Sequence, residues 1–67
     1  MPLIQINMAT GRTDDEKRAL LSAVTDAVEG SLGVRRSSIR VWINEFESTE
    51  YMAGGQLLAD AINARAD

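Results

Sequence analysis

Three places in the sequence carry residues that could do chemistry: Pro2, the Gly11-Arg12 pair and Arg40. The chain has no histidine and no cysteine. A base that works near neutral pH therefore has to be a carboxylate with a shifted pKa or the α-amino group. Removal of Met1 would make the secondary amine of Pro2 that group. A free α-amine titrates at ~7.7–8.0, and burial beside two arginines would lower its pKa and leave it unprotonated.

The two arginines indicate an anionic partner. Arg12 stands just before a predicted helix amino terminus, where backbone N–H groups and the helix dipole favour anions. Arg40 lies in a predicted strand between Ile39 and Val41, a costly place for a cation unless it faces an interface or a ligand. Plain explanations also exist, since proline commonly follows methionine and Arg12 could be a solvated loop residue.

The residues around these positions predict a β-α-β unit. In residues 3–8 and 39–46, aliphatic side chains on one face alternate with mostly polar side chains on the other, as they do in half-buried strands. Residues 14–32 carry apolar side chains at helical spacing. Residues 13–16 (Thr-Asp-Asp-Glu) form a capping box at the start of this helix, and Gly33 suits a left-handed cap at its end. A helical crossover of this kind joins parallel strands and is right-handed.

The last part of the chain gives weaker signals. After Glu47 the sequence turns polar. Residues 54–55 (Gly-Gly) predict a break in regular secondary structure, and residues 56–64 fit a short helix. We expect residues 1–67 to form a single domain of the α/β (α+β) class, built on one short β-α-β unit with parallel strands.

Such a unit cannot cover its own sheet. A chain of 67 residues buries only about 60% of its unfolded surface, and without cysteine it has no disulfides to compensate. One face of the sheet takes the helix, and the other would expose Trp42 to water. We therefore expect copies of the same chain to cover the open face and edges.

Composition excludes several classes of function. The net charge of −3 argues against a nucleic-acid partner, which would favour a basic surface. The absence of histidine and cysteine excludes zinc fingers and thiol nucleophiles. The opening residues have neither the basic region nor the apolar run of a signal peptide, and no stretch approaches a membrane span. These features predict a soluble cytoplasmic protein with no membrane partner.

Several motifs together resemble the 4-oxalocrotonate tautomerase family, the amino-terminal proline enzymes of the tautomerase superfamily. They are Pro-Leu-Ile-Gln-Ile at the start, Gly-Arg-Thr-Asp-Asp-Glu-Lys, Leu-Gly near residue 32, Ser-Ile-Arg-Val at 38–41 and Gly-Gly at 54–55. The resemblance covers nearly the whole chain. It implies a tautomerase that acts on 2-hydroxydienoate or enol-keto acids in aromatic catabolism. It further implies a tautomerase fold, assembly into a homohexamer (a trimer of dimers) and no metal or organic cofactor.

The resemblance also implies a role for each site residue. Pro2 would be the general base that removes a proton and returns it elsewhere. Arg12 would hold the distal carboxylate of a dicarboxylate substrate. Arg40 of a neighbouring subunit would bind the reacting end and stabilise the dienolate. Ser38 would line the same pocket, and Tyr51 takes the place of a phenylalanine that makes the site apolar.

Departures from the family pattern leave alternatives open. Thr10 replaces a common acid, and residues 51–55 replace Phe-Gly-x-Gly-Gly. Residues 11–20 also resemble the α subunit of trans-3-chloroacrylic acid dehalogenase, which needs a water-activating glutamate. Glu47 and Glu50 lie slightly upstream of the corresponding place. A hydratase, dehalogenase or decarboxylase of the same superfamily is therefore an alternative. A non-catalytic assembly subunit that partners a paralogue in a mixed hexamer is another alternative if the initiator methionine is retained.

Overall fold

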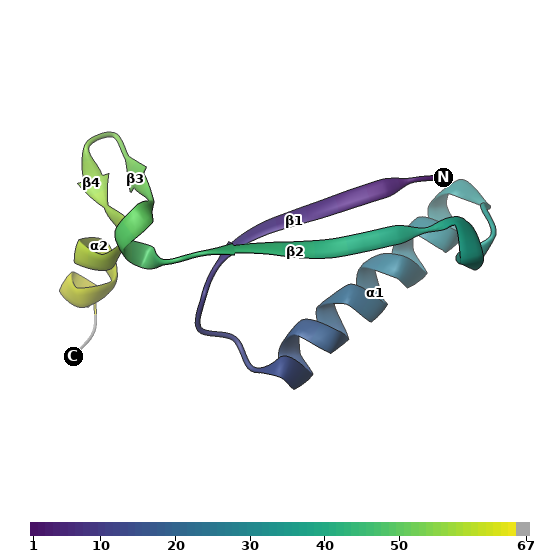
Figure 1. The fold of residues 1–67 in the computed structure, drawn as a ribbon, viewed down its shortest axis with the longest axis horizontal. Coiled ribbons are helices and arrows are strands. Elements are labelled where there is room, and N and C mark those ends of the chain that lie inside the picture. The colour runs from purple at the N-terminus through teal and green to yellow at the C-terminus, as the bar shows by residue number, and fades with distance from the viewer. Residues whose placement is uncertain (66–67) are drawn as a thin grey trace.

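The computed structural model describes residues 1–65 and contains the predicted β-α-β unit (Figure 1). Strands β1 (Leu3–Ala9) and β2 (Arg40–Phe46) pair in parallel, from Leu3 opposite Arg40 to Ala9 opposite Phe46. Helix α1 (Asp14–Leu32) makes the crossover between them. The fold class expected from the sequence is confirmed. No helix within the described residues is long and apolar enough to cross a membrane.

Both predicted ends of α1 are confirmed. The Thr13 amide donates a hydrogen bond to Glu16 Oε1 at 2.9 Å, and the Glu16 amide donates to Thr13 Oγ1 at 3.1 Å. This reciprocal capping box satisfies amides that the helix itself cannot pair. At the other end, Gly33 has φ 67° and donates its amide to the Glu29 carbonyl at 3.0 Å. The positive φ explains why glycine stands there.

The two faces of the sheet differ as the alternation predicts. On β1, Ile4, Ile6 and Met8 are half-buried, and the residues between them are exposed. On the opposite face of β2, the Trp42 side chain is 43% exposed. The sheet covers the apolar side chains of α1 only in part, since Leu32 at the end of the helix is 63% exposed. A single parallel strand pair with one helix leaves its second face without a partner.

The last part of the described chain forms an arm (residues 48–65) that stands away from the β-α-β unit (Figure 1). It comprises the short 3-10 helix η2 (Ser48–Glu50), a hairpin of β3 (Met52–Ala53) and β4 (Gln56–Leu57), and helix α2 (Leu58–Arg65). Residues 54–55 turn the hairpin with φ 59° and 85°, values that favour glycine. The predicted break at this pair is confirmed. The predicted helix begins two residues later than expected, because Gln56 and Leu57 pair with β3.

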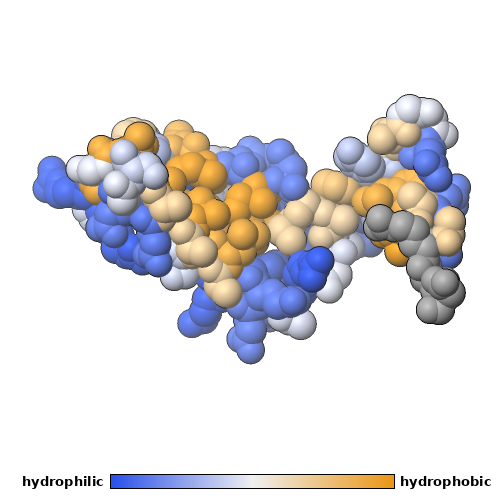
Figure 2. All heavy atoms as spheres, turned by 180° about the vertical axis from the view of Figure 1, so that it is seen from behind, coloured by the Kyte–Doolittle hydropathy of each residue, from blue (hydrophilic) through white to orange (hydrophobic). Residues whose placement is uncertain are grey.

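The chain is too extended to hide its own apolar surface. Its Cα radius of gyration is 15.3 Å, whereas a compact chain of this length has about 11 Å. It exposes 5093 Å², against about 4,200 Å² for a folded monomer of this mass. Ile39, at 8% exposure, is the one buried hydrophobic residue of the described chain. Hydrophobic residues gather in a broad patch on one side of the molecule (Figure 2). A patch of this kind is typical of a surface that binds another chain.

We therefore predict a stable oligomer in solution. Light scattering at micromolar concentration is expected to give a multiple of the 7.3 kDa chain mass, because one chain cannot supply the core that folding requires. A folded monomer of 7.3 kDa under these conditions would contradict this prediction.

Candidate active site

Pro2 lies at the amino end of the sheet, next to Arg40. The Arg40 amide donates a hydrogen bond to the Pro2 carbonyl at 3.1 Å, and Leu3 pairs with Arg40 in the strand register. Pro2 is half-buried, whereas Met1 before it is 80% exposed. The sheet thus fixes the backbone of Pro2 beside the start of β2.

The Arg40 guanidinium is held close to its own strand. Arg40 Nη1 donates to the Ser37 carbonyl at 2.7 Å and, more weakly, to the Ile39 carbonyl at 3.4 Å. Ser38, the last residue of the 3-10 helix η1 (Arg36–Ser38), donates its hydroxyl to the Arg35 carbonyl at 2.8 Å. A guanidinium has five N–H donors, and these bonds use a single nitrogen. The remaining face of the group can bind an anion.

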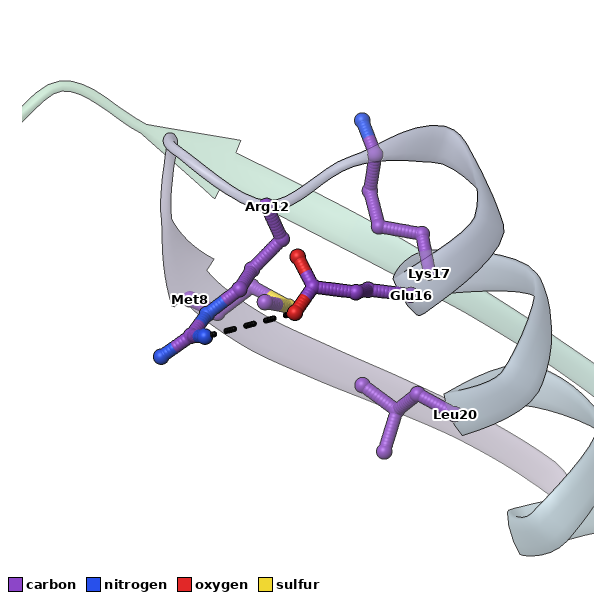
Figure 3. A pocket seen from close by; sticks show the side chains of 5 residues that line it. All are labelled: Met8, Arg12, Glu16, Lys17 and Leu20. Carbon is purple, nitrogen blue, oxygen red and sulfur yellow. Dashed lines mark ion pairs between the residues drawn. The ribbon is translucent and has the colours of Figure 1, made fainter.

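Arg12 lies at the opposite end of the sheet, in a pocket. The pocket has a volume of about 210 Å³ and is lined by side chains of β1, α1 and the loop between them: Met8, Arg12, Glu16, Lys17 and Leu20. Arg12 Nη1 is 3.7 Å from Glu16 Oε2 (Figure 3). Both side chains are well exposed, at 64% and 53%, so a ligand can reach the arginine.

The second cation of the pocket is already paired. Lys17 Nζ lies 3.2 Å from Glu45 Oε1 and 3.8 Å from Asp14 Oδ1. In Figure 3 its ammonium points away from the Arg12–Glu16 pair. The lysine therefore ties α1 to β2, and Arg12, held by the longer 3.7 Å contact with Glu16, is the pocket cation more accessible to an incoming carboxylate.

Tyr51 also lies beyond the carboxyl ends of the strands. Its ring stacks on Phe46 with centroids 5.3 Å apart and 16° between the planes. Phe46 is the last residue of β2 and pairs with Ala9. Tyr51 is 45% exposed, so one side of the phenol remains open.

A single chain does not bring all the predicted site residues together. Pro2, Ser38 and Arg40 lie at one end of the sheet, and Arg12 and Tyr51 lie beyond the other. Seven strand residues separate the ends, which corresponds to about 20 Å. A site that uses both groups needs at least two chains. Sequence reasoning missed Glu16 as a neighbour of Arg12, although the spacing of four residues places such side chains close together.

Comparison with known proteins places the chain in a family. Residues 2–61 match the family of tautomerase enzymes. A probable tautomerase of Listeria monocytogenes is 40% identical over 60 residues, covering 90% of this chain and 98% of the relative. The 2-hydroxymuconate tautomerase of Bacillus subtilis is 38% identical over 60 residues, covering 90% and 97%.

Solved structures agree with the sequence match. One of the 4-oxalocrotonate tautomerase isozymes of Methylibium petroleiphilum superposes with a TM-score of 0.88 at 38% identity, covering 94% of this chain and 98% of that one. A heterohexamer 4-oxalocrotonate tautomerase from Chloroflexus aurantiacus gives a TM-score of 0.85 at 30% identity, covering 90% and 97%. The chain therefore belongs to the 4-oxalocrotonate tautomerase family of the tautomerase superfamily.

Proposed function

We propose that this protein is a tautomerase of 2-hydroxydienoate or enol-keto acids that uses the amine of Pro2, freed by removal of Met1, to move a proton. The observation that carries the proposal is the 3.1 Å hydrogen bond from the Arg40 amide to the Pro2 carbonyl, which fixes the backbone of Pro2 at the end of the sheet where β2 begins. A base and a cation at one end of a sheet suit an acid whose enolate must be stabilised. The similarity to a 2-hydroxymuconate tautomerase supports the same substrate class.

The proposed proton transfer runs through the Pro2 amine. The unprotonated Pro2 amine takes a proton from the dienol hydroxyl or from a carbon next to the carbonyl. The dienolate that forms carries negative charge close to the substrate carboxylate. Arg40 binds that end and stabilises the charge as it develops. The protonated amine then returns the proton to another carbon of the conjugated chain, and the base is regenerated.

Arg12 is assigned to the distal carboxylate of a diacid. It lies about 20 Å from Pro2 along the strand, so in this proposal it comes from a second subunit. The resemblance to the family assigns Arg40 to a neighbouring subunit as well, and this stays a prediction. Ser38 is proposed to line the pocket where the reacting end of the substrate binds. Tyr51 is proposed to form a wall of the site, with a phenol where the family usually has the apolar ring of a phenylalanine.

Assembly into a homohexamer, a trimer of dimers, is part of the proposal. The open sheet face and the arm both expose large hydrophobic side chains, so each chain has more than one surface on which another chain could pack. The Chloroflexus aurantiacus relative is a heterohexamer, so six chains are compatible with this fold.

Hydration or dehalogenation is less well supported. Both would need a carboxylate free to activate water. Glu47 accepts a hydrogen bond from the Thr10 hydroxyl at 3.1 Å, and Glu50 accepts one from the Glu47 amide at 3.0 Å.

Because both glutamates hold the start of the arm in place, we expect turnover of 2-hydroxymuconate and none of 3-chloroacrylate. An intact mass must accompany this assay, since a chain that retains Met1 would be the silent assembly subunit.

The role of Arg12 gives a separate prediction. Arg12→Ala is expected to raise KM for 2-hydroxymuconate more than it lowers kcat, because the distal carboxylate is bound alike in the ground state and the transition state. Steady-state kinetics with a diacid and with a monoacid of the same class test it. If Arg12→Ala raises KM for the monoacid as much as for the diacid, Arg12 does not bind the distal carboxylate.

A further inference from the structure

We propose that Glu16 is a specificity-determining residue whose fixed carboxylate weakens the hold of Arg12 on the distal carboxylate of a substrate. Glu16 would thereby limit the preference of the enzyme for diacids over monoacids. This inference rests on the proposed function of Arg12, and it adds a residue of opposite charge to that end of the site.

The Glu16 carboxylate is held on both sides, unlike that of an ordinary surface glutamate. Its Oε1 accepts the Thr13 amide at 2.9 Å, and its Oε2 lies 3.7 Å from Arg12 Nη1. One oxygen thus completes the helix cap, and the other faces the arginine (Figure 3). The backbone hydrogen bond from Thr13 and, less strongly, the charge of Arg12 lower the pKa of Glu16. The group therefore stays ionised at neutral pH.

A carboxylate that enters this pocket has to approach Arg12 in the presence of that charge. The neighbouring Lys17 is paired with Glu45 at 3.2 Å and offers little compensation. Met8 and Leu20 line the same pocket and can contact the hydrocarbon part of a substrate. Repulsion between exposed like charges at this range corresponds to about a threefold to tenfold change in affinity.

The chain offers a clean variant and a matched control. Glu16→Gln removes the charge but keeps the cap, because glutamine fills the same position of a capping box. Asp15→Asn removes one negative charge from the same exposed helix turn. Both are assayed with 2-hydroxymuconate as the diacid and 2-hydroxy-2,4-pentadienoate as the monoacid. Glu16→Gln is expected to raise the diacid-to-monoacid ratio of kcat/KM about threefold to tenfold, mainly through KM of the diacid. Asp15→Asn is expected to leave the ratio near that of the wild type.

A double mutant separates this inference from the proposed function. In the Arg12→Ala background, Glu16→Gln is expected to have no effect on the ratio, since the two residues act on the same carboxylate. A ratio that responds equally to Glu16→Gln and Asp15→Asn, or still responds without Arg12, would overturn the inference and leave the role of Arg12 intact. A diacid KM that is unchanged by Arg12→Ala alone would overturn the binding role of Arg12, and this inference with it.

Discussion

Protein freed of Met1 is expected to convert 2-hydroxymuconate at least about 10²–10⁴-fold faster than protein that retains Met1, the usual contribution of a positioned general base. With Met1 attached, the nitrogen of Pro2 is an amide with no basicity. The Met1 residue is 80% exposed, and the hydrogen bond from Arg40 to the Pro2 carbonyl does not involve it. The two forms should therefore differ in chemistry and share their fold. Intact mass quantifies the forms, and steady-state kinetics compares them.

Two controls confirm that the amine itself is responsible. The pH profile of kcat/KM should rise through a single ionisation below ~7.7–8.0, because desolvation and nearby arginines disfavour the protonated amine. A 3-halopropiolate should label residue 2 and abolish turnover, while Pro2→Ala keeps some activity through its primary amine. Equal activity with and without Met1 would exclude Pro2 as the base, and Glu45, Glu47 and Glu50 would be the next candidates.

Arg40→Ala is expected to lower kcat about 10²–10³-fold with a smaller change in KM, because its guanidinium meets charge that develops in the transition state. The bonds that this variant loses go to the carbonyls of Ser37 and Ile39, so the strand itself should remain. Rapid kinetics at saturating substrate measures the effect on kcat.

Arg35→Ala is the matched control, because Arg35 is exposed and lies in the same connector before β2. It should keep the wild-type kcat. Arg40→Lys should give an intermediate rate, since lysine keeps the charge but loses the planar fork. An equal fall in kcat for Arg35→Ala and Arg40→Ala would mean that the overall positive charge of this region, and not the position of Arg40, determines the rate.

The parts of the fold that were predictable have local signals. Strand alternation, the capping box at Thr13 and the left-handed Gly33 lie within a few residues of the features they specify, and all three are confirmed. The β3–β4 hairpin was missed. Strands of two residues are too short to show alternation, and the Gly-Gly pair was interpreted only as a break, although it also suits a two-residue hairpin turn.

The candidate site was predictable residue by residue but not as an arrangement. Residue type and motif single out Pro2, Arg12 and Arg40. Their distribution between the two ends of the sheet follows from strand length, which the sequence gives only approximately. The Arg12–Glu16 contact at 3.7 Å depends on side-chain rotamers. The sequence showed Glu16 only as a helix cap, because a pattern cannot tell that the two oxygens of one carboxylate have different neighbours.

The scarcity of buried residues has a consequence for how this protein responds to dilution. Ile39 is the one buried hydrophobic residue of the described chain, so in the isolated protomer little remains to oppose unfolding. In the proposed oligomer, chain folding and chain association would then be a single equilibrium. For an assembly of many chains, each tenfold dilution would remove about 1 kcal/mol of stability per chain by mass action. A substitution at Trp42 on the open sheet face would accordingly behave like a substitution in the interior of a larger protein, with its severity set by concentration.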